Sequence, residues 1–136
     1  MTVFICIDER GGRLFYGKRQ SRDPKVIEDV IRCADDGVLY ISDFSEKLFA
    51  DSTASVICVP APLEVAGADA YVFCEEAPLG EYVDKIDKLI IYNWNEHYPS
   101  DFKLDIDPLK CGFKLRSKRE FKGVAHKLIS REDYVK

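Results

Sequence analysis

The stretch Val3-Phe4-Ile5-Cys6-Ile7, followed by Asp8-Glu9-Arg10-Gly11-Gly12, decides the fold of this chain of 136 residues. An unbroken run of β-branched and aromatic residues suits a strand that is buried on both faces of a sheet. The adjacent glycines permit the positive φ of a sharp turn. A basic loop, Lys18-Arg19-Gln20-Ser21-Arg22, then leads to a helix. The sequence therefore predicts a central strand, a turn, a loop and a helix in that order.

The predicted helix has a marked start and a marked end. Asp23 can accept hydrogen bonds from free backbone N–H groups, and Pro24 fits the first turn. Apolar residues at helical spacing predict one buried face, formed by Val26, Ile27, Val30, Ile31 and Ala34. Asp36-Gly37 ends the segment. Because the loop before the helix follows the carboxyl end of a central strand, where open α/β sheets bind ligands, we expect a ligand site there.

Further apolar runs alternate with short helical segments. Buried strands are predicted at 38–41, 55–59, 70–74 and 88–94, with helical segments at 42–49, 62–66 and 79–86. A repeated strand–helix order indicates a mostly parallel sheet with right-handed crossovers. Strict apolar–polar alternation at 101–106, at 113–116 and in parts of 126–135 indicates antiparallel strands. We predict one α/β domain over residues 1–136, with three layers, a mostly parallel central sheet and a C-terminal antiparallel hairpin.

Composition is that of an ordinary globular protein. Apolar residues make up 46% and charged residues 32%, which excludes the disordered and membrane classes. No apolar run is long enough to span a bilayer, and a signal-peptide pattern is lacking, so we expect a cytoplasmic protein without membrane contact. Five cysteines without a C-x-x-C pair predict buried free thiols. With two histidines beside them, we expect no metal site.

The net charge of −4 is unevenly distributed. Residues 110–136 contain nine Lys or Arg and three Asp or Glu, whereas residues 1–109 contain eleven and twenty-one. Arg116, Lys118, Arg119 and Lys122 lie in the basic segment and could contact nucleic acid phosphates. Their alternation with apolar residues is also typical of the solvent-exposed face of any sheet. We favour this structural interpretation over nucleic-acid binding.

The order of the predicted elements resembles dihydrofolate reductase. The run Lys88-Leu89-Ile90-Ile91-Tyr92, followed by Tyr98-Pro99-Ser100-Asp101-Phe102, is similar to a late strand of that family and its Asp-containing loop. Segments 113–120 and 126–134 resemble its last hairpin. The resemblance covers most of the chain and implies a dihydrofolate reductase-like fold. It also places Asp23 where the family has its catalytic carboxylate, although an N-cap is the simpler role.

Two segments depart from the family where it binds NADPH. A Gly-Gly pair lets backbone amides approach the pyrophosphate in the family, whereas Cys74-Glu75-Glu76-Ala77-Pro78 stands there in this chain. The family's Gly-Arg-x-Thr turn is replaced by Ser42-Asp43-Phe44-Ser45. Carboxylates repel phosphate and proline lacks an amide hydrogen. We therefore expect no NADPH and no other cofactor.

A second resemblance concerns short clostridial proteins that often carry the label ribonuclease Z. They share stretches like Arg19-Gln20-Ser21-Arg22-Asp23 and Tyr92-x-Trp94-Asn95-x-x-Tyr98-Pro99. The label implies a phosphodiesterase whose His-x-His-x-Asp-His loop binds metal ions that activate water. This chain has two histidines and no such loop, so it lacks the residues for that chemistry.

Four cations near the predicted helix start are candidate ligand-binding residues. Arg13, Lys18, Arg19 and Arg22 flank one turn and together could hold a phosphate or carboxylate, although a solvated loop is the simpler interpretation. Ser21 and Ser45 are not expected to be nucleophiles, because neither has a nearby histidine base and neither lies in a G-x-S-x-G elbow. His126 is expected to titrate in water.

These observations favour a binding or regulatory module over an enzyme. We expect a reductase-like domain that has lost its cofactor site and binds a small anionic ligand or a protein partner. One alternative is a diverged NAD(P)H-dependent reductase that uses Asp23 as proton donor. The other is an RNA-interacting protein that uses the basic hairpin. The sequence is compatible with a homodimer but does not predict one.

Overall fold

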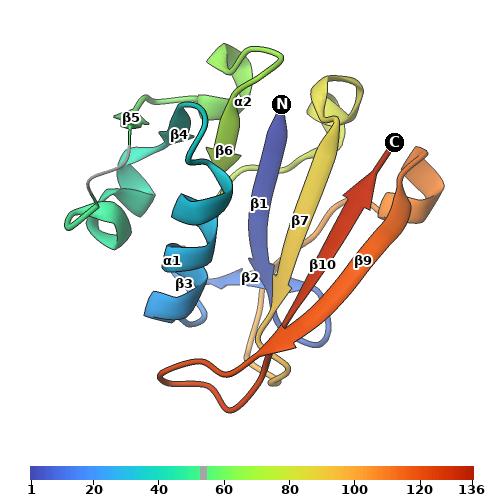
Figure 1. Cartoon of the computed structure of the whole chain (residues 1–136). Helices are drawn as coiled ribbons and strands as arrows, with labels where there is room; N and C mark the ends of the chain where they lie inside the picture. The colour runs from blue at the N-terminus through green and yellow to red at the C-terminus, as the bar shows by residue number, and fades with distance from the viewer. Residues whose placement is uncertain (53–54) are drawn as a thin grey trace.

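A computed structural model describes residues 1–52 and 55–136, and its centre is a seven-stranded sheet with the strand order β5-β4-β6-β1-β7-β10-β9 (Figure 1). The strands are β1 (Thr2–Ile7), β4 (Leu39–Ile41), β5 (Val56–Cys58), β6 (Tyr71–Phe73), β7 (Lys88–Asn93), β9 (Lys114–Phe121) and β10 (Ile129–Val135). β1 pairs in parallel with β6 and β7, and β4 pairs in parallel with β5 and β6. β10 pairs antiparallel with β7 and β9. The predicted central strand, mostly parallel sheet and C-terminal hairpin are confirmed.

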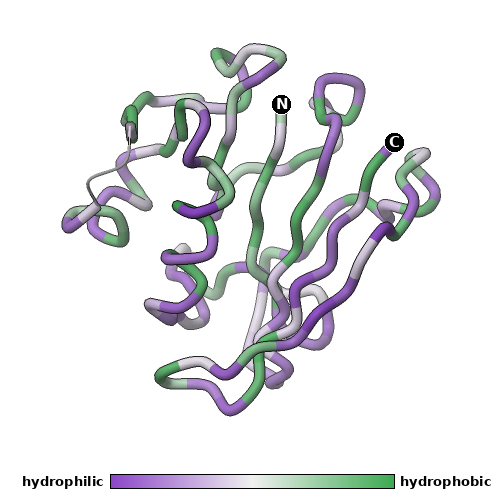
Figure 2. Tube along the Cα trace, in the orientation of Figure 1, coloured by the Kyte–Doolittle hydropathy of each residue, from purple (hydrophilic) through white to green (hydrophobic). Residues whose placement is uncertain are grey.

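Helical segments cover both faces of this sheet. They are α1 (Pro24–Cys33), α2 (Pro62–Val65) and the 3₁₀ helices η1 (Asp43–Phe49), η2 (Gly80–Lys85) and η3 (Pro108–Cys111). Successive side chains of a strand point to opposite faces, so Phe4 of β1 packs into one core with α1 and η1. Its neighbours Val3 and Ile5 pack into the other core with α2 and the residues that flank η2. Figure 2 shows the resulting difference between the apolar central strands and the polar strand β9.

The segment between β1 and α1 is a hairpin and not an open loop. β2 (Gly12–Phe15), β3 (Lys18–Arg19) and β8 (Phe102–Lys103) form a second, three-stranded sheet in the order β3-β2-β8. Tyr16 and Gly17 make the hairpin turn with φ values of 50° and 70°. The alternation at 101–106 correctly predicted an antiparallel strand, but β8 has two residues and pairs with β2. The hairpin folds Arg13 and Arg19 back toward the main sheet.

Some predicted elements differ in detail. The helical segments expected at 42–49 and 79–86 form as 3₁₀ helices, which is common for short pieces. The cysteines are free, but the expectation that they are buried holds only for Cys74. Cys6, Cys33 and Cys111 are half-buried, and Cys58 is exposed on the edge strand β5. Among the described residues, no helix is both long and apolar enough to cross a bilayer.

The buried carboxylate of Asp29 ties α1 to the sheet. Tyr92 Oη of β7 donates to it at 2.6 Å and Arg131 Nη1 of β10 at 2.8 Å, and Arg119 of β9 pairs with it as well. Burial raises the pKa of Asp29, but these partners lower it further than burial raises it. The carboxylate is therefore ionised and holds α1 against three strands.

Replacing this carboxylate tests its structural role. Asp29→Ala leaves the Tyr92 hydroxyl without its acceptor and Arg131 without one of its two carboxylates, so we expect the free energy of unfolding to fall by about 3 kcal/mol. Urea denaturation followed by circular dichroism measures the change. Glu28→Ala, on the exposed side of the same helix, is the control and should change stability by less than about 0.5 kcal/mol. Equal effects of the two substitutions would contradict the role of Asp29.

Candidate functional site

Asp23 caps α1 and at the same time binds the loop that precedes β10. Its carboxylate accepts four hydrogen bonds, from Lys25 N (3.0 Å), Val124 N (3.0 Å), Ala125 N (2.8 Å) and His126 Nδ1 (2.9 Å). Gly123 makes this approach possible, because a Cβ there would lie 2.5 Å from Asp23 Oδ2. The predicted N-cap is confirmed, and it also anchors a loop about a hundred residues away (Figure 1).

The surroundings of Asp23 keep it ionised. The side chain is 0% exposed, and burial raises its pKa. The hydrogen bonds from His126 and from the backbone of Val124, Lys25 and Ala125 outweigh burial and lower the pKa to about 2. Near neutral pH this carboxylate is therefore a hydrogen-bond acceptor and has no proton to donate.

His126 is buried between Asp23, Ser21 and Trp94. Its side chain is 4% exposed, and the indole of Trp94 stacks on the ring at a centroid distance of 4.5 Å. His126 Nε2 lies 2.8 Å from Ser21 Oγ and 3.4 Å from Tyr98 Oη. His126 was expected to be surrounded by water, but the structure buries it. The expectation that Ser21 has no histidine near it was wrong. No local pattern joins residues this far apart, and Gly123 is the one sequence feature that fits the close approach.

Arg19 is bound to Glu75 in a bidentate ion pair. Its Nε lies 2.8 Å from one carboxylate oxygen and its Nη2 lies 2.9 Å from the other. Ser45 Oγ also donates to this carboxylate, at 2.6 Å, and Arg19 Nη2 also donates to the Phe44 carbonyl. Glu75 therefore joins β3 of the β2–β3 hairpin to η1.

The remaining predicted cations lie in different places. Arg13 is 4% exposed and donates to the carbonyls of Ala77 at 2.7 Å and Cys74 at 3.0 Å. Lys18 is exposed on β3, and Arg22 is exposed before α1. The structure thus brings Arg13 and Arg19 together and separates them from Lys18 and Arg22.

A small hollow lies beside Ser21. Its volume is about 10 Å³, enough for one water-sized group. The residues that line it are Cys6, Arg13, Arg19, Gln20, Ser21, Glu75 and Trp94. Within residues 1–52 and 55–136, Arg13 Nε is a buried donor with no hydrogen-bond partner. Ser21 and Arg13 therefore line the hollow together with Glu75, whose carboxylate is paired with Arg19.

A larger groove separates α1 from η1. Its volume is about 500 Å³, within the range of small-molecule sites. Ile27 and Ile31 of α1 and Leu48 of η1 line it, with Arg22 and Lys47 at its edge. Ile27 and Ile31 were predicted to lie in the core, but the structure leaves them half-buried in the groove. A third hollow, next to Ser21 and Trp94, shares Arg22, Ile27 and Leu48 with the groove.

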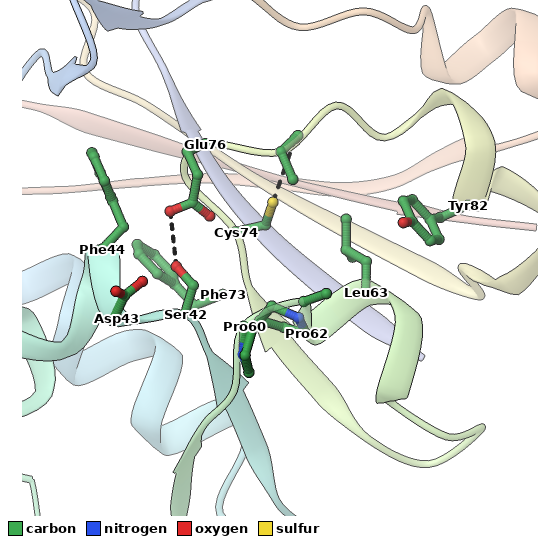
Figure 3. Close-up of a pocket in the computed structure, with 12 residues that line it drawn as sticks. Ser42, Asp43, Phe44, Pro60, Pro62, Leu63, Phe73, Cys74, Glu76 and Tyr82 are labelled. Carbon is green, nitrogen blue, oxygen red and sulfur yellow. Dashed lines mark hydrogen bonds between the residues drawn. The ribbon is translucent and has the colours of Figure 1, made fainter.

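A separate pocket, of about 370 Å³, lies at the carboxyl ends of β4 and β6 (Figure 3). Ser42, Asp43 and Glu76 gather at one end of it, and Leu63 and Tyr82 lie at the other. Ser42 Oγ donates to Glu76 Oε2 at 2.8 Å. The polar end of this pocket is therefore acidic.

The candidate nucleic-acid residues on β9 do not share one surface. β9 is an edge strand, and Lys118 lies opposite Glu132 of β10. Arg116 is exposed at the register shift between Ser117 and Leu115, so it falls outside the regular alternation. Arg119 points to the face opposite to that of Lys118. There it pairs with Asp29 and lies over the Phe121 ring. Lys122 follows the end of the strand and is exposed. The four cations therefore form no continuous stripe.

Comparisons with known proteins support the fold. No protein family matches the sequence, and no curated protein matches it. Among solved structures, the chain is similar to dihydrofolate reductase from Enterococcus faecalis complexed with NADP(H) and RAB-propyl, with a TM-score of 0.70. The match has 12% sequence identity and covers 98% of this chain and 94% of the other. The chain therefore has a dihydrofolate reductase-like fold.

The pKa of Asp23 predicts a pH dependence of stability. Because this pKa is lowered from 3.8 to about 2, the ionised carboxylate stabilises the fold fully only well above pH 3.8, and the effect is lost as the pH falls toward 2. Asp23→Asn keeps a capping oxygen but lacks the charge. We expect wild type to exceed this variant by about 2 kcal/mol at about pH 6 and by about half of that at about pH 3. Urea unfolding at the two pH values measures the difference, and a difference independent of pH would contradict the assignment.

Proposed function

We propose that this reductase-like domain binds a small amphipathic anion in the groove between α1 and η1. The observation that supports this proposal best is the apolar floor of that groove, formed by half-buried Ile27, Ile31 and Leu48, with two cations at its edge. A site of this size with a mostly apolar lining and a few polar groups is typical of small-molecule binding. The proposal concerns binding and requires no cofactor.

The charges at the groove select the ligand. Among the ion pairs of residues 1–52 and 55–136, none involves Arg22 or Lys47. Glu28 at the rim is paired with Lys25 at 3.4 Å, so its charge is partly compensated. Asp51 is the other exposed acid at this rim. Two cations with exposed ends can therefore bind a carboxylate, sulfonate or phosphate group of the ligand.

The pocket at the ends of β4 and β6 does not suit a dinucleotide. Asp43 and Glu76 line it, and carboxylates repel the phosphates of NADPH. Two arginines lie close to it, but Arg19 is bound to Glu75 and to the Phe44 carbonyl, and Arg13 donates to the Cys74 and Ala77 carbonyls. These contacts support a domain without the cofactor site of a reductase.

The alternative of a diverged reductase with Asp23 as proton donor has less support. Asp23 is ionised and accepts four hydrogen bonds, so it has no proton to give near neutral pH. An RNA-binding hairpin also has less support, since Arg119 of β9 is engaged with Asp29. The groove is the site on which the proposal rests.

The fluorescent sulfonate 1-anilinonaphthalene-8-sulfonate tests the proposal, because it joins an apolar ring system to an anionic group. We expect it to bind the folded chain, and we expect Arg22→Ala with Lys47→Ala to weaken binding about tenfold, or by about 1.4 kcal/mol. Ile31→Glu, which puts a carboxylate on the groove floor, should abolish binding. Fluorescence titration of samples with unchanged circular dichroism measures both effects.

The matched control is Arg116→Ala with Lys118→Ala, which removes two exposed cations from β9 and should leave the affinity unchanged. NADPH is the comparison ligand and should not raise the thermal midpoint of unfolding, whereas the Enterococcus faecalis reductase serves as positive control. The proposal would be refuted if the β9 substitutions weakened sulfonate binding, or if NADPH raised the thermal midpoint of unfolding.

A further inference from the structure

We propose that Ser21 is a nucleophile, activated by His126 and Asp23, and that the chain hydrolyses an ester or thioester. The three side chains form a hydrogen-bonded chain in space. The distance is 2.8 Å from Ser21 Oγ to His126 Nε2 and 2.9 Å from His126 Nδ1 to Asp23 Oδ2. This inference goes beyond ligand binding, and it rests on the proposed groove only for the class of substrate.

The hydrogen bonds determine which ring nitrogen carries the proton. Asp23 is an acceptor, so His126 Nδ1 must donate to it. In the neutral ring, Nε2 then has a free lone pair and accepts the hydrogen bond of the Ser21 hydroxyl. A serine next to such a nitrogen, with a carboxylate behind the ring, is the arrangement that makes a hydroxyl nucleophilic near neutral pH.

The surroundings hold these groups in place. Three backbone N–H groups, of Lys25, Val124 and Ala125, fix the Asp23 carboxylate, and Trp94 stacks on the His126 ring. The ring therefore keeps its orientation while a proton moves onto Nε2. The ionised Asp23 stabilises the imidazolium that forms. Ser21 itself is half-buried and lines two hollows.

The hollow beside Ser21 provides a place for the negative charge that develops on the substrate oxygen. Ser21 and Arg13 both line it, and its volume of about 10 Å³ suits a single oxygen atom. Arg13 is 4% exposed, and its Nε–H finds no partner among the described residues. A preorganised donor away from bulk water is what stabilises an oxyanion.

The reaction balances with water as the second reactant. Ser21 Oγ forms a bond to the acyl carbon and passes its proton to His126 Nε2, while the carbonyl oxygen becomes the oxyanion next to Arg13. The bond from the acyl carbon to the leaving group breaks, and the leaving alcohol or thiol takes the proton from Nε2. Water then attacks the acyl-serine and gives a proton to Nε2. Finally, the Oγ–carbon bond breaks, Oγ regains that proton, and the carboxylic acid leaves.

The route between groove and serine indicates the class of ester. The hollow next to Ser21 and Trp94 shares Arg22, Ile27 and Leu48 with the α1–η1 groove. A substrate that places its reacting carbonyl at Ser21 would therefore extend along α1 with an apolar portion that carries an anionic group. The shape of this route favours small esters or thioesters of amphipathic acids.

A fluorophosphonate probe tests the nucleophile without requiring the natural substrate. The serine oxygen displaces fluoride from phosphorus, so intact mass and peptide mapping report the modified residue. We expect one label, at Ser21, and hydrolysis of p-nitrophenyl acetate that falls at least about 100-fold in Ser21→Ala and in His126→Gln. Ser117→Ala, which removes an exposed serine of β9, is the matched control and should change neither result.

The variants separate catalysis from folding. Ser21→Ala removes one half-buried oxygen and should retain the circular dichroism spectrum and the sulfonate affinity of wild type, even if His126→Gln unfolds. No label, a label on another residue, or full hydrolysis by folded Ser21→Ala would overturn the proposal. If Ser21 is labelled but the chain does not bind the sulfonate, the proposed ligand-binding role of the groove is refuted and the proposed nucleophile is still supported.

Discussion

The structure around the candidate site depends on one buried carboxylate. Asp23 begins α1, and its four hydrogen bonds also fix the loop that leads into β10. An ionised carboxylate without solvent contact needs such donors, because burial of an unpaired charge is very costly. The side chain that caps a helix therefore also places His126. Asp29, on the same helix, joins α1 to the C-terminal strands and so fixes one wall of the groove.

The pocket at the ends of β4 and β6 and the α1–η1 groove differ in their charged groups, because cations line only the groove. Acidic Asp43 and Glu76 line the pocket at the ends of β4 and β6, where a dinucleotide would need positive charge or free amides. Arg22 and Lys47 lie at the α1–η1 groove. The Arg19–Glu75 ion pair leaves the Arg19 guanidinium bound within the fold. The dinucleotide-binding charges that a reductase would need are therefore not presented by Asp43, Glu76 or Arg19.

Local patterns predicted the fold, and contacts between distant residues decided the site. The central strand, α1 with its Asp23 cap and the C-terminal hairpin each follow from periodicity or turn residues within a few positions. The partnership of Ser21 with His126 spans 105 positions, so no spacing rule detects it. The ion pair of Arg19 with Glu75 could not be predicted either, because it depends on a two-residue strand that folds Arg19 back onto Glu75. Helical periodicity predicts which residues share the apolar face of α1, but it does not distinguish those in the core from those that line a groove, such as Ile31.

Nuclear magnetic resonance of the His126 ring tests the central relation between Asp23 and the distant loop most directly. Nitrogen and proton shifts distinguish the two neutral tautomers of histidine, and a buried N–H bound to a carboxylate exchanges slowly with water. For the neutral ring, we predict a protected proton on Nδ1 and an unprotonated Nε2. A neutral ring with its proton on Nε2, or a ring that exchanges freely with solvent, would contradict this relation.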